Sequence, residues 1–238
     1  FGLQPFQDDR GIKPTGIGEH NFFRGRHFHF LHVEYFPALN GFSGAGQGQG
    51  LHARTRCGTA GNMNHFQDKA RAARDAMRDV FPATPLQRNE HLCARYDANI
   101  LLKREDLSPV RSYKLRGAFN AMRKVLKNNN KNTKFVCASA GNHAQGVAFM
   151  CRCFGVHGVI FMPVTTPQQK IGKTEIFGGD MIEIRLIGDY FDDTLEAAQN
   201  YCTQAGGHFL SPFDDEDVIE GQASVAAEIE QQLNAAPD

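Results

Sequence analysis

The residue of this sequence best suited to covalent chemistry is a lysine at the start of a predicted helix. Lys114 lies in the octapeptide 112–119 (Ser-Tyr-Lys-Leu-Arg-Gly-Ala-Phe), between an extended run at 99–103 and a helical run at 115–126. A lysine amine can form a Schiff base with an aldehyde, and desolvation near the positive end of a helix lowers its pKa toward the nucleophilic free amine. A solvated lysine beside Arg116 is the simpler interpretation, and the octapeptide alone favours it.

A second stretch favours the covalent role of Lys114 over that of a solvated lysine. Residues 135–138 (Phe-Val-Cys-Ala) have the composition of a short buried strand. Residues 139–146 (Ser-Ala-Gly-Asn-His-Ala-Gln-Gly) follow as a turn that opens into a helix. Parallel sheets bind ligands at the carboxyl ends of their strands, and that is where Ser139 to Asn142 would lie.

Together the two stretches resemble the fold-type II pyridoxal-phosphate enzymes, and within them the threonine/serine ammonia-lyases (dehydratases). The resemblance extends from about Asp68 to Leu233. It includes motifs at 83–86 (Ala-Thr-Pro-Leu), 103–107 (Lys-Arg-Glu-Asp-Leu) and 212–215 (Pro-Phe-Asp-Asp). Cysteine-forming members of the superfamily carry a sequence of the type Ser-x-Lys-Asp-Arg, so Leu115 after the lysine indicates the dehydratase branch.

Composition favours a small-molecule ligand. The 238 residues hold 26 Lys plus Arg and 26 Asp plus Glu, which gives no preference for nucleic acid or an acidic membrane. The sequence has no run of about 18 apolar residues, so no membrane span is predicted. The six cysteines form no C-x-x-C pair, which is typical of reduced thiols and predicts a cytoplasmic location.

The first 62 residues differ from the rest. They hold 12 of the 24 glycines and 8 of the 19 phenylalanines, without a helical or alternating period. We predict that 1–62 is a poorly ordered extension, or upstream translated sequence, outside the enzyme fold. His27, His29 and His32 have a spacing that a metal can use, but no cysteine or carboxylate partner stands beside them, so no metal site is predicted. The glycine-rich run 44–50 lacks a preceding strand and is interpreted as a linker, not a phosphate loop.

The remaining chain has a strand and helix pattern. A helix is predicted at 67–80 and a short helix or turn at 86–92. Later strands are expected at 134–138, 158–162, 181–187 and 208–210, and helices at 143–154, 167–177, 192–205 and 218–233. This alternation predicts βαβ units, and therefore an α/β fold with a parallel sheet between two helix layers.

The resemblance implies how these elements are divided. The fold would be the three-layer, tryptophan synthase β-like fold of the fold-type II enzymes. Residues 63–126 would be the first part of the large cofactor domain and 127–214 the small α/β domain. Residues 215–238 would begin the remainder of an incomplete large domain.

The resemblance also implies the roles of the site residues. Lys114 would hold pyridoxal 5'-phosphate as a Schiff base and then take the α-proton of the substrate. Tyr113 would lie against the cofactor ring, although an ordinary half-buried aromatic is the alternative. Asn142 would hydrogen-bond the ring oxygen.

The turn before the second helix would bind the substrate carboxylate. Ser139, Ala140, Gly141 and His143 would line it, with backbone N–H groups at a helix start favouring an anion. For His143, a packing role is an equal alternative. Related serine racemases carry a second serine where this chain has Ala140, so the alanine favours elimination over racemisation.

The function implied is elimination of ammonia from L-threonine to give 2-oxobutanoate, as in isoleucine biosynthesis, by an enzyme that is a homo-oligomer at full length. A catabolic serine/threonine dehydratase, a serine racemase and a non-catalytic α/β module are the alternatives. Family members continue past 219–222 into a glycine-rich loop that holds the cofactor phosphate. Because residues 223–238 contain no such loop, we expect this chain alone to be a fragment that binds the cofactor weakly and is inactive.

Overall fold

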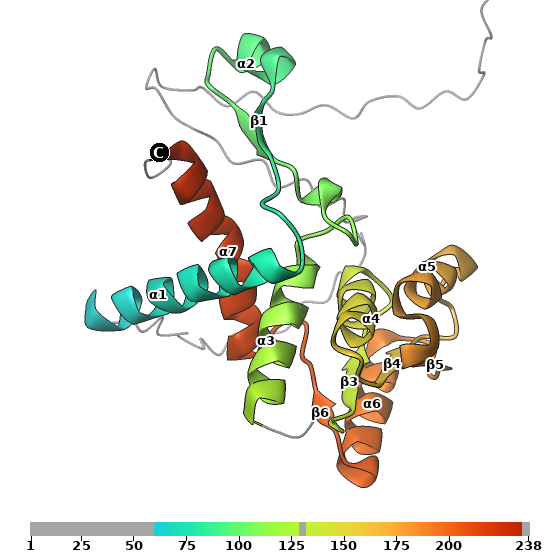
Figure 1. Cartoon of the computed structure of the whole chain (residues 1–238). Helices are drawn as coiled ribbons and strands as arrows, with labels where there is room; N and C mark the ends of the chain where they lie inside the picture. The colour runs from blue at the N-terminus through green and yellow to red at the C-terminus, as the bar shows by residue number, and fades with distance from the viewer. Residues whose placement is uncertain (1–59, 129–131, 235–238) are drawn as a thin grey trace, which may run out of the picture.

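A computed structural model describes residues 60–128 and 132–234 of the chain (Figure 1). In chain order its elements are α1 (Ala60–Ala76), η1 (Met77–Asp79), β1 (Leu86–Arg88), α2 (Glu90–Tyr96), β2 (Leu101–Lys103), η2 (Glu105–Leu107), α3 (Lys114–Asn128), β3 (Phe135–Ala138), α4 (Asn142–Phe154), β4 (Gly158–Met162), α5 (Gln168–Gly178), η3 (Gly179–Met181), β5 (Ile182–Leu186), α6 (Phe191–Ala205), β6 (His208–Phe209) and α7 (Glu216–Leu233). The elements predicted after residue 133 are all present, each end within two residues of its predicted place. The predictions for 1–59, including the three histidines and the glycine-rich run, lie outside the described residues.

Four parallel strands form the main sheet, in the order β5-β4-β3-β6. Every residue of β3 and β4 is buried, as expected for parallel strands that are covered on both faces. Helix α4 packs on one face, where Phe135 and Ile160 join the larger hydrophobic core. Helix α6 packs on the other, where Val136 and Phe161 meet Ala198. The predicted α/β fold with helices on both faces is therefore confirmed.

Strands β1 and β2 form a separate antiparallel pair, with Leu86 opposite Lys103. The prediction of a short helix or turn at 86–92 was therefore wrong for its first three residues. Those residues extend because they pair with a strand distant in sequence, which overrides local preference. The helical part follows as α2, where the Asn89 side chain caps the helix by accepting from Leu92 N at 2.9 Å.

Helices α1, α3 and α7 pack together beside the sheet (Figure 1). Gly117 of α3 and Gly221 of α7 permit the close approach, because a Cβ atom at Gly221 would collide with the backbone oxygen of Arg116. Helix α7 packs on both α1 and α3, whereas the division into 63–126, 127–214 and 215–238 stays a prediction.

Candidate functional site

Lys114 is the first residue of α3, and the turn before it is held by a serine. The Ser108 hydroxyl donates to the Ser112 carbonyl at 3.0 Å and accepts from the Ser112 N–H at 3.0 Å. Arg111, inside this turn, has a φ of 59°, a left-handed conformation that non-glycine residues adopt infrequently. The turn at 108–112 therefore holds the backbone just before Lys114 through local hydrogen bonds, which involve no residue of the sheet.

The amine of Lys114 lies between two aromatic rings. Its Nζ is 5.3 Å from the ring centroid of Tyr113 and 5.6 Å from that of Phe213, and it donates to the carbonyl of Pro212 at 3.3 Å. Pro212 and Phe213 follow β6, so this segment leaves the sheet at the carboxyl end of a strand. Phe213 is 63% exposed, which leaves the outer side of the amine site open.

The turn 139–141 leaves the neighbouring strand β3 at the same edge. The Ser139 hydroxyl accepts from Gly141 N at 3.2 Å, and α4 then begins at Asn142. Gly141, at the N-cap, provides no side-chain cap, so the first N–H groups of α4 have no partner inside the helix. Such a helix start favours an anion. Asn142 is exposed, and Ser139, Ala140 and Gly141 are partly exposed.

Three contacts bring Lys114 and this turn together. A Cβ atom on Gly146, one helical turn after Asn142, would lie 3.2 Å from the carbonyl carbon of Lys114, so α4 touches the backbone of the lysine. The ring of His143 bonds to the carbonyl of Leu210 at 3.1 Å, and Lys114 bonds two residues further along the same segment. These contacts connect the start of α3, the start of α4 and the segment after β6 at one edge of the sheet, and the roles of the residues there stay a prediction.

The His143 side chain is 3% exposed, within the protein interior. Its pKa is lowered to about 4, mainly because of burial; the bond to the Leu210 carbonyl opposes this lowering, and the positive charge of Lys114 contributes a smaller part of it. The imidazole is therefore neutral at physiological pH. This placement favours the packing role for the ring, while the backbone N–H of His143 stays in the first turn of α4.

A mainly apolar cavity of about 590 Å³ lies between α1, β2 and α7. Tyr113 and Gln222 are among its lining residues, whereas Lys114 and residues 139–143 are not. The cavity is therefore distinct from the lysine site. In the part of the chain that the structure describes, no group of three His, Cys, Asp or Glu side chains is placed to hold a metal, and no helix has the length and apolarity to cross a membrane.

Sequence reasoning gave no role to three residues that shape the site. Phe213 belongs to a motif noted above, but its contact with the lysine depends on how β6 ends. Gly146 lies one turn beyond Asn142, a spacing that places it on the same face of α4 and that was a usable signal. Arg116 is fully buried, although charged residues are seldom buried and its neighbours in sequence gave no indication.

The chain is similar to several known proteins. A family model described as "Pyridoxal-phosphate dependent enzyme" matches residues 78–238. The chain is 50% identical over 165 residues to a biosynthetic L-threonine dehydratase of Bacillus subtilis, covering 69% of this chain and 39% of that protein. The solved structure of processed threonine deaminase isoform 2 from Solanum lycopersicum has a TM-score of 0.66 at 36% identity, covering 74% of this chain and 47% of the other. The solved structure of a pyridoxal 5'-phosphate-dependent aspartate racemase has a TM-score of 0.65 at 27% identity, covering 70% of this chain and 51% of the racemase chain.

Proposed function

We propose, from the premise that this chain belongs to the pyridoxal-phosphate-dependent enzyme family, that its site serves the elimination of ammonia from L-threonine. The chain spans about two fifths of the length of the Bacillus subtilis relative. Activity, substrate and assembly are therefore proposed for the whole protein of which such a site is part. The observation that carries the proposal is the placement of the Lys114 amine beside the 139–142 turn, in a chain 50% identical to a threonine dehydratase.

The residues at the site fit the family's cofactor. An aldehyde needs an amine that is reachable, and Lys114 is partly exposed between two rings able to face a flat heteroaromatic group. A ring oxygen needs a polar partner, and Asn142 is exposed at the start of α4. Lys114, Tyr113 and Asn142 are therefore the residues proposed to hold pyridoxal phosphate.

Each residue has a physical task in the proposed reaction. When bound, the cofactor supplies an electron-withdrawing ring that acidifies the α C–H of the substrate. Lys114 takes this proton; its amine stands at the start of α3, where it bonds to the Pro212 carbonyl and lies near the rings of Tyr113 and Phe213. The Ser139 hydroxyl, which accepts from the Gly141 N–H, and the N–H of His143 at the start of α4 hold the carboxylate. Loss of the β-hydroxyl as water, followed by hydrolysis, releases 2-oxobutanoate and ammonia.

Ala140 separates elimination from racemisation. Racemisation needs a proton donor on the face opposite the lysine, and an alanine methyl cannot donate one. Although one structural relative is an aspartate racemase, Ala140 supports elimination in this chain. L-Serine stays an alternative substrate, because it differs from threonine by a single methyl group, which a pocket discriminates only weakly.

A chimera tests the proposal. Residues 78–238 would replace the matching part of the Bacillus subtilis enzyme, and ammonia and 2-oxobutanoate formed from L-threonine would be measured with added cofactor. We expect turnover that Lys114→Ala abolishes, and slower turnover of L-serine. A folded chimera that binds the cofactor but releases no ammonia would contradict the function. Equal activity in Lys114→Ala would contradict the role of the lysine.

Two further statements about the whole protein stay predictions: it is a homo-oligomer, and it is cytoplasmic. Light scattering of the active chimera tests the first, and fractionation of cells that express the protein tests the second. The alternative of a non-catalytic α/β module predicts a folded chimera that is inactive with every amino acid.

A further inference from the structure

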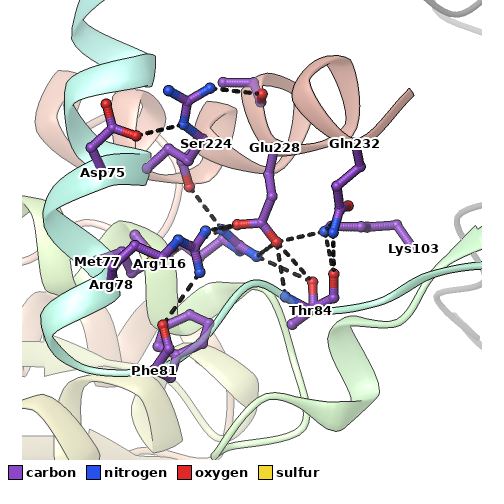
Figure 2. Close-up of polar contacts among 12 residues, drawn as sticks. Asp75, Met77, Arg78, Phe81, Thr84, Lys103, Arg116, Ser224, Glu228 and Gln232 are labelled. Atoms are coloured by element: carbon purple, nitrogen blue, oxygen red, sulfur yellow. Dashed lines mark hydrogen bonds and ion pairs between the residues drawn. The ribbon is translucent and has the colours of Figure 1, made fainter. Parts of the chain in front are cut away.

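A buried group of charged and polar side chains surrounds Arg116, two residues after Lys114. We call it the arginine cluster and define it as Thr84, Lys103, Glu105, Arg116 and Glu228. Arg116 is fully buried and stands two residues after Lys114, in the first turn of α3. Figure 2 shows its guanidinium, Thr84 and Lys103 pointing toward the carboxylate of Glu228 on α7.

The first partner of Arg116 comes from the segment that leads to the lysine. Arg116 Nε donates to Glu105 Oε2 at 2.8 Å and Nη2 donates to Glu105 Oε1 at 2.7 Å. This is a two-pronged pair, which fixes orientation as well as distance because the guanidinium is planar. Glu105 belongs to η2, only nine residues before Lys114, so the pair ties the segment before the lysine to the helix after it.

The second partner comes from the other end of the described chain. Arg116 Nη1 donates to Glu228 Oε2 at 3.1 Å, and Nη2 donates to Oε1 at 3.2 Å. The same carboxylate accepts from Thr84 N at 2.9 Å and from Lys103 Nζ at 2.5 Å. Three segments, those of Thr84, Glu105 and Glu228, therefore bond directly to one guanidinium, and Lys103 is linked to it through Glu228. The guanidinium cannot shift without breaking bonds to several of them.

Stability alone is a weak explanation for such a group. Desolvation of buried charges offsets much of their attraction, and apolar residues of similar size frequently serve as well. What buried charges do well is fix one arrangement among several, because a shift leaves a charge unpaired. The arrangement fixed here is the first turn of α3, which approaches α4 closely where Gly146 meets the backbone of Lys114 and Leu115.

We propose that Arg116, held by Glu105 and Glu228, is a positioning residue that sets where the Lys114 amine stands relative to the 139–142 turn. The proposal rests on the proposed function in one respect, namely that Lys114 is the reacting amine. It adds that the reactivity of this amine depends on a cluster that contacts neither cofactor nor substrate.

The same pair of helices provides a matched control. Lys124, ten residues after Lys114 on α3, bonds to Asp217 and to the buried Glu220 of α7. Lys124→Met therefore also breaks a bridge between α3 and α7, but about 15 Å along the helix from Lys114. A merely structural role predicts that this variant and the cluster variants act alike.

The test measures reactivity without turnover. The full chain would be treated with pyridoxal 5'-phosphate and borohydride, and labelling rates at individual lysines would be read by peptide mass. The exposed Lys173 on α5 is the internal reference. The variants are Glu105→Gln, which keeps the shape, and Arg116→Lys, which keeps the charge, with fragment masses separating the introduced lysine from Lys114. Thermal midpoints measured by circular dichroism would set a temperature at which each is folded.

We expect both cluster variants to lower the ratio of Lys114 to Lys173 labelling about tenfold or more, since small displacements of a reacting group have effects of this size. Lys124→Met should lower the thermal midpoint but leave the ratio within about twofold. An equal ratio in all three variants, or failure of both cluster variants to fold, would overturn the proposal in favour of a structural role. If Lys114 in the unaltered chain reacts no faster than Lys173, the fault lies instead with the proposed function.

Discussion

The two halves of the site are built in different ways. The half made of β3 and α4 stands on a neutral apolar sheet, in which every strand residue from Phe135 to Ala138 is buried. The half made of α3 stands on the buried arginine cluster. Apolar packing tolerates small rearrangements, whereas paired buried charges do not. The comparison indicates that the 139–141 turn is held by apolar packing, and the start of α3 at Lys114 by buried paired charges.

The largest expected effect breaks the charged half. Glu228→Leu leaves Arg116 and Lys103 buried with one carboxylate fewer, so the free energy of unfolding should fall by about 3–5 kcal/mol. Urea denaturation measures it. Glu230→Leu, on the same helix, is the control, because its partly exposed pair with Arg71 contributes about 0–1 kcal/mol. Similar losses of unfolding free energy in the two variants would mean that the arginine cluster stabilises the fold no more than a partly exposed ion pair does.

In the half made of β3 and α4, the pH dependence of stability reports on the buried His143. His143 has a pKa of about 4 when folded and about 6.5 when unfolded, so the unfolded state binds more protons between these values. Stability should fall as pH drops from 6.5 to 4, by about 3 kcal/mol from this residue, and be unaffected by it above pH 6.5. Urea denaturation at several pH values would show this slope.

The matching variant is His143→Gln, which can still donate to Leu210 but does not titrate in this range. It should remove that part of the slope. An unchanged slope would mean that the histidine is charged in the fold or that its environment opens before it protonates.

A substitution at the contact between the two halves is expected to reduce the free energy of unfolding less. Gly146→Ala places a methyl group 3.2 Å from the backbone at Lys114 and Leu115, and overpacking of this kind costs about 1–3 kcal/mol. It should also slow labelling of Lys114 by pyridoxal phosphate. The control is Gly172→Ala on α5, where a Cβ meets nothing within 4 Å and helix propensity predicts a gain of about 0.5–1 kcal/mol. Equal thermal shifts would remove Gly146 as the spacer between the halves.

The smallest effect is expected in the sheet itself. Ile160→Val removes one buried methyl group from β4, at a cost of about 0.5–1.5 kcal/mol. Calorimetry should show the same loss at every pH where the protein folds, because no charge is involved. A strongly pH-dependent loss would show that the two halves are not independent.

Predictions from the sequence were accurate where a local pattern decides the structure. The continuous apolar runs at β3 and β4 predicted buried parallel strands, and the polar residues after β3 predicted the turn at their carboxyl end. The prediction at 86–92 failed for residues 86–88, because β1 exists only through its pairing with β2. The contact of the Phe213 ring with the Lys114 amine was not predicted either, because it depends on β6 being the neighbour of β3.

The sequence by itself determined which lysine begins a helix, which glycine-containing turn follows a buried strand, and which family the two motifs resemble. Only the tertiary structure decided that Arg116 is buried, that its partners come from η2 and α7, and that Gly146 touches the lysine backbone. The physical reason is range. Helix caps, turns and apolar periods act between residues a few positions apart, whereas Arg116 and Glu228 stand 112 positions apart and meet only when the helices pack.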